Sequence, residues 1–170
     1  MASDRLTVEA VESKRDLEAF LRVPWPIFAD DPHWIPPLLL ERRRHLSPKH
    51  NPWFEHGEAR FWLARRGGQP VGRISAQIDY LRLQHHRDQA GNFGFLDAVD
   101  DGEVFAALLE SAENWLRSRG MRQVIGPFSL SINDESGLLV EGFDHPPSMM
   151  MGHARPWYGP RLEEQGYRKV

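Results

Sequence analysis

Polar and ionisable side chains are concentrated between residues 129 and 158, a segment that follows a short apolar run. Serines, an asparagine, several carboxylates and two histidines accompany Pro146-Pro147 and three consecutive methionines. Carboxylates and imidazoles can transfer protons, and hydroxyl and amide groups can stabilise charge that develops in a reaction. The segment is also long for a connection between a strand and a helix. We therefore expect a functional loop; the alternative is a set of turn-forming and core-filling residues.

A second set of polar side chains lies on an expected β-hairpin. Residues 61–64 and 71–78 are separated by Gly67-Gly68, and glycines can adopt the positive φ angles of tight turns. In the second strand, one face is apolar and the other carries Arg73, Ser75, Gln77 and Asp79. Such a row is unremarkable if it faces water. If it lines a cleft, we expect it to contact the substrate.

Composition narrows the class of protein. A chain of 170 residues can bury one full core, and its net charge of −3 argues against a nucleic-acid partner. The absence of cysteine removes disulfides and thiol nucleophiles, and the eight histidines form no metal-binding motif, so we expect no metal. No apolar run reaches the ~20 residues that span a bilayer, and the N-terminus lacks the apolar region of a signal peptide. We expect a cytoplasmic protein.

The first elements must position these side chains. Residues 6–11 predict a strand, and Ser13 predicts the N-cap of a helix through residue 21. Prolines and tryptophans between residues 24 and 37 exclude a long helix and favour either a packed surface loop or the wall of a ligand groove. Residues 38–44 predict a short helix with a basic end. That end is interpreted as a solvated terminus, a phosphate site or a peripheral contact with anionic lipid.

The strongest predicted helix covers residues 102–119, with Asp100 or Asp101 as its cap and Gly120 as its stop. Its apolar side chains recur at helical spacing: Val104, Phe105, Leu108, Leu109, Ala112, Trp115 and Leu116. Residues 92–96 and 123–125 predict strands. Residues 160–165 predict a helix that Gly166 ends, and residues 167–170 predict the start of another strand. These strands and helices indicate a single α/β (α+β) domain, residues 1–170.

This order resembles the GNAT acyltransferase superfamily, which implies a mixed central β-sheet flanked by helices. The resemblance rests on "LARRGGQPVGRI", "LDAVDDGEVFAALLESAENWLRSRGMRQV" and "YGPRLEEQGYRKV", which are similar to the family's hairpin, its strand–helix–strand unit and its closing helix and strand. The stretch "GPFSLSINDESGLLVEGFDHPPSMMMGHARPWY" resembles a narrower group that includes the bacterial ceramide synthases. "PWPIFADDPHWIPPL" and "NPWFEHGEARFWLARR" also match that group. Its members are longer, with a second lobe, so the chain resembles an N-terminal lobe.

The resemblance implies amide formation between an acyl-CoA or acetyl-CoA co-substrate and an amine, such as a sphingoid or other lipid amine. Such a reaction needs a base for the amine, donors for the oxyanion and a proton for the thiolate. Glu135 or His153 would be the base. The donors for the oxyanion would be Asn133, Ser129 and Ser131. A soft apolar wall would be formed by Met149, Met150 and Met151.

Two departures from the family pattern accompany the resemblance. Where GNAT enzymes hold the CoA pyrophosphate, the chain reads Val99-Asp100-Asp101-Gly102-Glu103, and three carboxylates there would repel a pyrophosphate. Where many members place a catalytic tyrosine, the chain has Leu162, so Tyr158 would serve as the acid only after a shift of its helix.

These departures leave two functions open. The first is an N-acyltransferase. The second is a non-catalytic GNAT-shaped lobe that binds substrate or docks to a second lobe or to another copy of the chain. The acidic turn favours the second function, whereas the polar row and the segment 129–158 are compatible with both.

Overall fold

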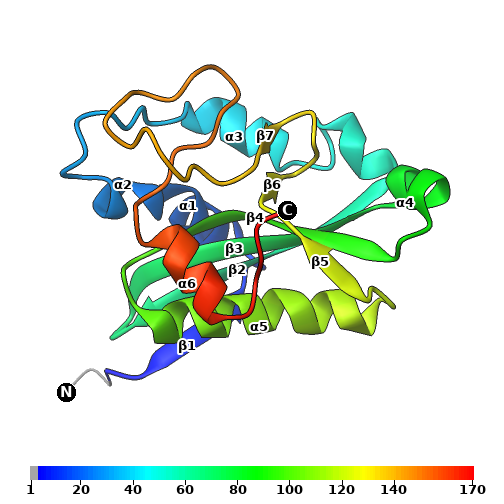
Figure 1. Ribbon diagram of the computed structural model, residues 1–170, viewed down its shortest axis with the longest axis horizontal. Coiled ribbons are helices and arrows are strands. Elements are labelled where there is room, and N and C mark those ends of the chain that lie inside the picture. The colour runs from blue at the N-terminus through cyan, green and yellow to red at the C-terminus, as the bar shows by residue number, and fades with distance from the viewer. Residues whose placement is uncertain (1–3) are drawn as a thin grey trace.

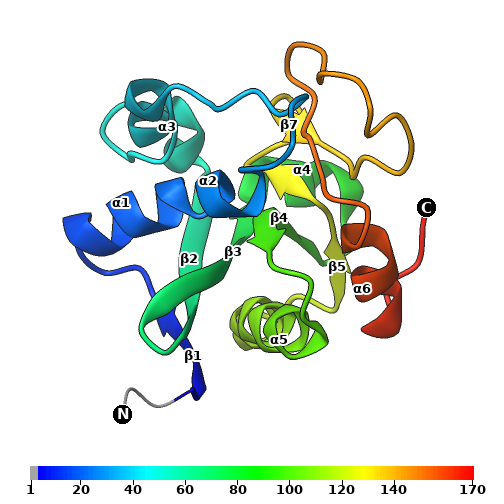
Figure 2. The same cartoon turned by 90° about the vertical axis from the view of Figure 1, so that its left-hand side faces the viewer.

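The computed structural model describes residues 4–170, which form a five-stranded sheet with helices on both faces (Figures 1 and 2). The strand order is β1-β2-β3-β4-β5. Strands β1 (Leu6–Ala10), β2 (Gly57–Arg66), β3 (Gln69–Asp79) and β4 (Ala90–Ala98) pair antiparallel, and β5 (Gln123–Ile125) runs parallel to β4. This confirms the predicted mixed sheet. At the β2–β3 turn, Gly67 and Gly68 have φ angles of 56° and 81°, as the hairpin requires.

Helix α5 (Gly102–Ser118) covers one face of the sheet, and α1 (Lys14–Arg22) with the short α2 (Pro24–Ile27) covers the other (Figure 2). Asp101 caps α5 by accepting the N–H of Glu103, and all seven apolar residues predicted for its stripe are buried. Ser13 forms a capping box with Asp16 at the start of α1. Helix α6 (Tyr158–Glu164) lies beside α5 and begins two residues before the predicted helix.

Several short elements complete the fold. They are α3 (Leu39–His45), the 3₁₀ helix η1 (Pro52–Glu55), α4 (Tyr80–His86), β6 (Phe128–Ser129) and β7 (Glu135–Ser136). Helix α3 and the β6–β7 pair lie on the side of the sheet that α1 and α2 cover (Figures 1 and 2). None of the helices between residues 4 and 170 is long and apolar enough to cross a bilayer.

Strands β4 and β5 pair over only three residues, and the chain after β5 then lies directly against β4. Gly94 permits this approach, because a Cβ there would lie 1.7 Å from the Phe128 carbonyl oxygen. Gln77 Nε2 donates to the carbonyls of Phe128 and Leu130, and the Phe95 N–H donates to Ser129 Oγ at 3.2 Å. Polar groups on β3 and β4 therefore anchor the start of the segment 129–158.

The strand predicted for residues 167–170 was wrong. The Tyr167 N–H bonds to Leu162 O at 3.1 Å, and its hydroxyl donates to Glu113 Oε1 at 2.9 Å. Residues 167–170 pair with no strand among residues 4–170. A strand needs a neighbouring backbone, and the local sequence alone does not supply one.

Candidate functional site

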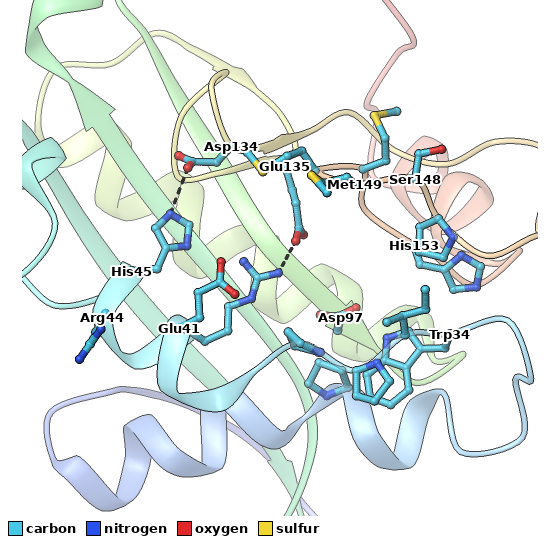
Figure 3. A pocket seen from close by; sticks show the side chains of 18 of the residues that line it. Trp34, Glu41, Arg44, His45, Asp97, Asp134, Glu135, Ser148, Met149 and His153 are labelled. Carbon is cyan, nitrogen blue, oxygen red and sulfur yellow. Dashed lines mark hydrogen bonds and ion pairs between the residues drawn. The ribbon is translucent and has the colours of Figure 1, made fainter.

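A groove of about 730 Å³ lies on the side of the sheet opposite α5. One wall is the proline- and tryptophan-rich segment around α2 with α3, and the other is the loop at residues 147–151 (Figure 3). The nearly buried side chains of Arg73 and Asp97 form the floor. The segment 24–37 thus forms a groove wall, one of its two predicted interpretations. Figure 3 shows His45 and His153 at opposite ends of the groove, with Glu135 between them.

Glu135 lines the groove from β7 and forms an ion pair with Arg42 of α3. Both side chains are largely buried, and the Arg42 guanidinium also lies 5.7 Å from the centre of the Phe95 ring. Arg73 is not available as a partner for Glu135, because it binds Asp97 instead. Arg42 comes from the basic helix end, so that end is not wholly solvated.

The floor of the groove is a buried ion pair. Arg73 donates from Nε and Nη2 to Asp97 Oδ2, at 2.9 and 2.7 Å, and the Tyr158 hydroxyl donates to Asp97 Oδ1 at 3.0 Å. Burial raises the pKa of Asp97, and Arg73 and Tyr158 act against this rise. Burial, followed by the Asp97 charge, raises the pKa of Tyr158 well above its ordinary value, which keeps the hydroxyl protonated.

His153 faces the groove with only 3% of its side chain exposed. Its Nε2 lies 2.8 Å from Asp31 Oδ2, and Arg155 Nη1 lies 3.7 Å from the same oxygen. Burial acts to raise the pKa of Asp31, but the hydrogen bond from His153 and other favourable contacts outweigh it and lower the pKa. Because an ionised carboxylate only accepts, Nε2 carries the proton and Nδ1 of a neutral ring is free to accept one.

A second histidine–carboxylate pair closes the other end of the groove. His45 Nε2 lies 3.4 Å from Asp134 Oδ1, an ion-pair distance rather than a tight hydrogen bond. Ser131 donates from its hydroxyl and its N–H to Asp134 Oδ2, at 2.8 and 3.1 Å. Burial acts to raise the pKa of Asp134, yet the interactions with His45 and Ser131 lower it to about 2.

The other predicted site residues occupy different places. Ser75 is buried and donates to Gln77, Gln77 holds the chain at residues 128–130, and Asp79 caps α4 and contacts His56. Of the predicted polar row, Arg73 alone lines the groove within residues 4–170.

Within the segment 129–158, the structure brings some predicted residues to the groove and not others. Met149 and Met150 line its rim and are 92% and 55% exposed. Ser129 is buried against β4, and the Ser131 hydroxyl is engaged by Asp134. Asn133 is exposed in the turn, away from the lining of the groove.

Asp31, Arg42, His45 and Asp97 belong to the site although they were not among the predicted site residues. These side chains belong to the loop after α2, to α3 and to β4, which are distant in sequence from the segment 129–158. The one local signal was the unusual proline–tryptophan segment around Asp31. Among residues 4–170, no group of three or more histidine or acidic side chains is placed to hold a metal ion.

Solved structures share this architecture. A predicted acetyltransferase with acetyl-CoA from Clostridium acetobutylicum matches with a TM-score of 0.55 and 9% identity, over 98% of this chain and 92% of that chain. A putative acetyl transferase from Pyrococcus furiosus matches with a TM-score of 0.50 and 17% identity, over 98% and 95% of the two chains. The chain has a GNAT-like fold. No family model matches the sequence.

About half of the residues of this GNAT-like chain are identical in two longer curated proteins. Protein YghO of Escherichia coli (strain K12) is 50% identical over 169 residues, and the bacterial ceramide synthase of Caulobacter vibrioides (strain NA1000 / CB15N) is 51% identical over 166 residues. The matches cover 99% and 97% of the chain but 43% of each relative. The chain is therefore homologous to less than half the length of either protein.

The start of α5 does not fit a CoA pyrophosphate in this GNAT-like chain. Arg66 donates to Asp101 Oδ2 at 2.8 Å and to Glu103 Oε2 at 2.7 Å, and Arg161 donates to Asp100 Oδ1 at 2.9 Å. The carboxylates thus hold both nearby arginines and occupy the helix N-terminus, where an anion would otherwise bind. The acidic turn stabilises the helix and offers no built phosphate site.

Proposed function

We propose that the chain is the GNAT-like lobe of an N-acyltransferase that joins the acyl group of an acyl-CoA to an amine, such as a sphingoid or other lipid amine. The observation that carries the proposal is one groove in which Glu135, paired with Arg42, and His153, hydrogen-bonded to Asp31, face the same space. The similarity to the Caulobacter ceramide synthase supports the reaction class.

The groove contains groups that amide formation requires. The amine must lose a proton, which the free Nδ1 of His153 or the Glu135 carboxylate would accept. Arg42 and Arg73 bring N–H donors to the groove that would stabilise the developing oxyanion. Tyr158 is 1% exposed and its hydroxyl donates to Asp97, so its role here is to position the floor.

The rim suits a substrate with an apolar chain. Ile35 on one side of the groove and Met149, Met150 and Met151 on the other are each more than half exposed. Unbranched methionine side chains adapt to flexible ligands, whereas a free polar amine would gain little from them. An amphipathic amine would place its head among the charged pairs and its chain along this rim.

The acidic turn at α5 supports the second candidate, a lobe that binds the amine without holding CoA. Its three carboxylates are paired with Arg66 and Arg161 where the fold would otherwise receive phosphate. In that case a second lobe would bring the acyl donor to the groove.

The test is an amide-forming assay with the longest natural form of the protein, acyl-CoA and a long-chain amine, followed by mass spectrometry. Glu135→Gln and His153→Asn are compared with Glu110→Gln, which changes an exposed carboxylate on α5. We expect one or both groove variants to stay folded at the assay temperature and to lose far more product formation than any fall in melting temperature accounts for. Full activity of both variants would exclude the catalytic roles, and a loss that follows the melting temperature would show structural ones. Absence of product from the unmodified protein would favour the non-catalytic lobe.

A further inference from the structure

A second cavity lies behind the groove, enclosed by residues 136–142 and 145–153. This loop cavity has a volume of about 350 Å³. Its lining is predominantly apolar and contains Leu138, Leu139, Val140, Pro146, Pro147 and Met151. The carboxylate and the imidazole of its rim, Glu141 and His145, belong to exposed residues. Such a volume lies at the lower end of the ~300–1,000 Å³ range of small-molecule sites.

The loop cavity adjoins the groove through a junction. A small cavity of about 60 Å³ between them shares Arg73, Asp97 and Glu135 with the groove. The residues that it shares with the loop cavity include Leu138, Leu139 and two glycines. His153 lines all three. The charged pairs and the apolar cavity therefore meet at one imidazole.

His153 carries an unsatisfied polar atom at this junction. Its Nε2 is bonded to Asp31, but the buried Nδ1 has no hydrogen-bond partner within the described part of the chain. Buried polar atoms are almost always paired, so an unpaired one calls for an explanation. A ligand with a polar group at the junction would supply the missing partner.

We propose that the loop cavity binds the aliphatic chain of a lipid substrate, with the polar group of that substrate at the junction against His153 Nδ1. The inference rests on the proposed function, because it places one chain of the same reaction. An aliphatic chain fits the apolar lining, and His153 lines both this cavity and the charged groove. Both a fatty acyl group and a long-chain amine have this chemistry, so the experiment must separate these two sources.

Methyl NMR on the full chain locates the ligand without any need for activity. The probes are decanoyl-CoA and decylamine, below their critical micelle concentrations, with CoA and butylamine as controls that lack the long chain. We expect one long-chain probe to shift the methyl signals of Leu138, Leu139 and Val140, and the short controls to leave them unchanged. The probe that acts identifies the source as acyl donor or amine. Shifts confined to Ile35 and Met149 on the groove rim, or no shifts, would overturn the proposal.

A matched pair of variants tests the same site by obstruction. Val140→Trp places a large ring on the lining of the loop cavity, and Ile132→Trp places it on another exposed position, which lines none of the three cavities. We expect Val140→Trp to weaken binding of the active long-chain probe at least tenfold, and Ile132→Trp to leave binding unchanged. Equal affinities of the two variants would overturn the proposal.

These measurements separate the inference from the proposed function. A protein that makes no amide but shows the chain-dependent shifts keeps the lipid site and loses the enzymatic assignment. A protein that makes amide without those shifts keeps the assignment and loses the site.

Discussion

Replacement of Asp97 by asparagine should destabilise the protein strongly, although the two side chains have nearly the same shape. Arg73 and Asp97 are 8% and 11% exposed, and two hydrogen bonds of 2.7 and 2.9 Å join them. Asparagine would leave the Arg73 charge buried without a counter-charge, because a guanidinium does not lose its proton in a protein. Breaking a buried pair in this way costs roughly 3–5 kcal/mol of unfolding free energy.

The contribution of Tyr158 should be smaller. Tyr158→Phe removes one hydrogen bond to a charged acceptor, which is worth about 1.5–3 kcal/mol. A variant that replaces the whole network, Arg73→Met with Asp97→Val and Tyr158→Phe, leaves no unpaired charge. We expect that triple variant to be more stable than Asp97→Asn alone.

Urea unfolding at pH 7 measures these differences. For a domain of this size, the loss in Asp97→Asn corresponds to a fall in melting temperature of roughly 6–20 °C. Asp144→Asn, at an exposed carboxylate, is the control and should stay within about 0.5 kcal/mol. A loss below about 1 kcal/mol in Asp97→Asn would refute the reasoning, because it would mean that no buried charge depends on the Asp97 carboxylate.

Three further outcomes follow from single contacts. Gly94→Ala should destabilise by roughly 1–3 kcal/mol or more in urea unfolding, because the new Cβ would lie 1.7 Å from the Phe128 carbonyl oxygen; an unchanged midpoint would contradict the tight seat of β6. Calorimetry should detect no micromolar binding of CoA or acyl-CoA to the chain, and such binding, if abolished by Asp101→Lys, would disprove the argument from the acidic turn. In the folded protein the pKa of Asp134 is lowered from its ordinary 3.8 to about 2. The ionised carboxylate therefore stabilises the fold above pH 4 by up to about 2 kcal/mol, and this stabilisation is lost as the pH falls through 2. Asp134→Asn should abolish that part of the pH dependence of the unfolding free energy. An unchanged pH dependence between pH 2 and pH 4 would contradict this prediction.

The elements that the sequence predicted well depend on local rules. The stripe of α5 repeats every three to four residues, its cap precedes it directly, and Gly120 adopts the φ of 81° expected at its end. The β2–β3 hairpin follows from two glycines between two apolar runs. In these cases the residues that determine the structure are neighbours in the chain.

The residues of the site were only partly predictable for the opposite reason. Glu135 was a candidate, but its partner Arg42 lies 93 positions away, and His153 meets Asp31 across 122 positions. No short pattern specifies such pairs, because each depends on how α2, α3 and the segment 129–158 pack over the sheet. Asn133 and Glu135 are two residues apart, yet one is exposed in a turn and the other lines the groove.

Local periodicity, caps and turn glycines were therefore enough for the hairpin and the main helix, and the resemblance of the element order to the GNAT superfamily added the mixed sheet. Tertiary packing decided that Arg73 neutralises Asp97. It also decided that Ser75 and Gln77 point away from the groove, where Ser75 donates to Gln77 and Gln77 binds the backbone at residue 130. It also decided that residues 167–170 form no strand with residues 4–170, although their sequence favours one. The physical reason is the same in each case: burial of a charge or pairing of a strand requires a partner, and that partner is supplied by a distant part of the chain.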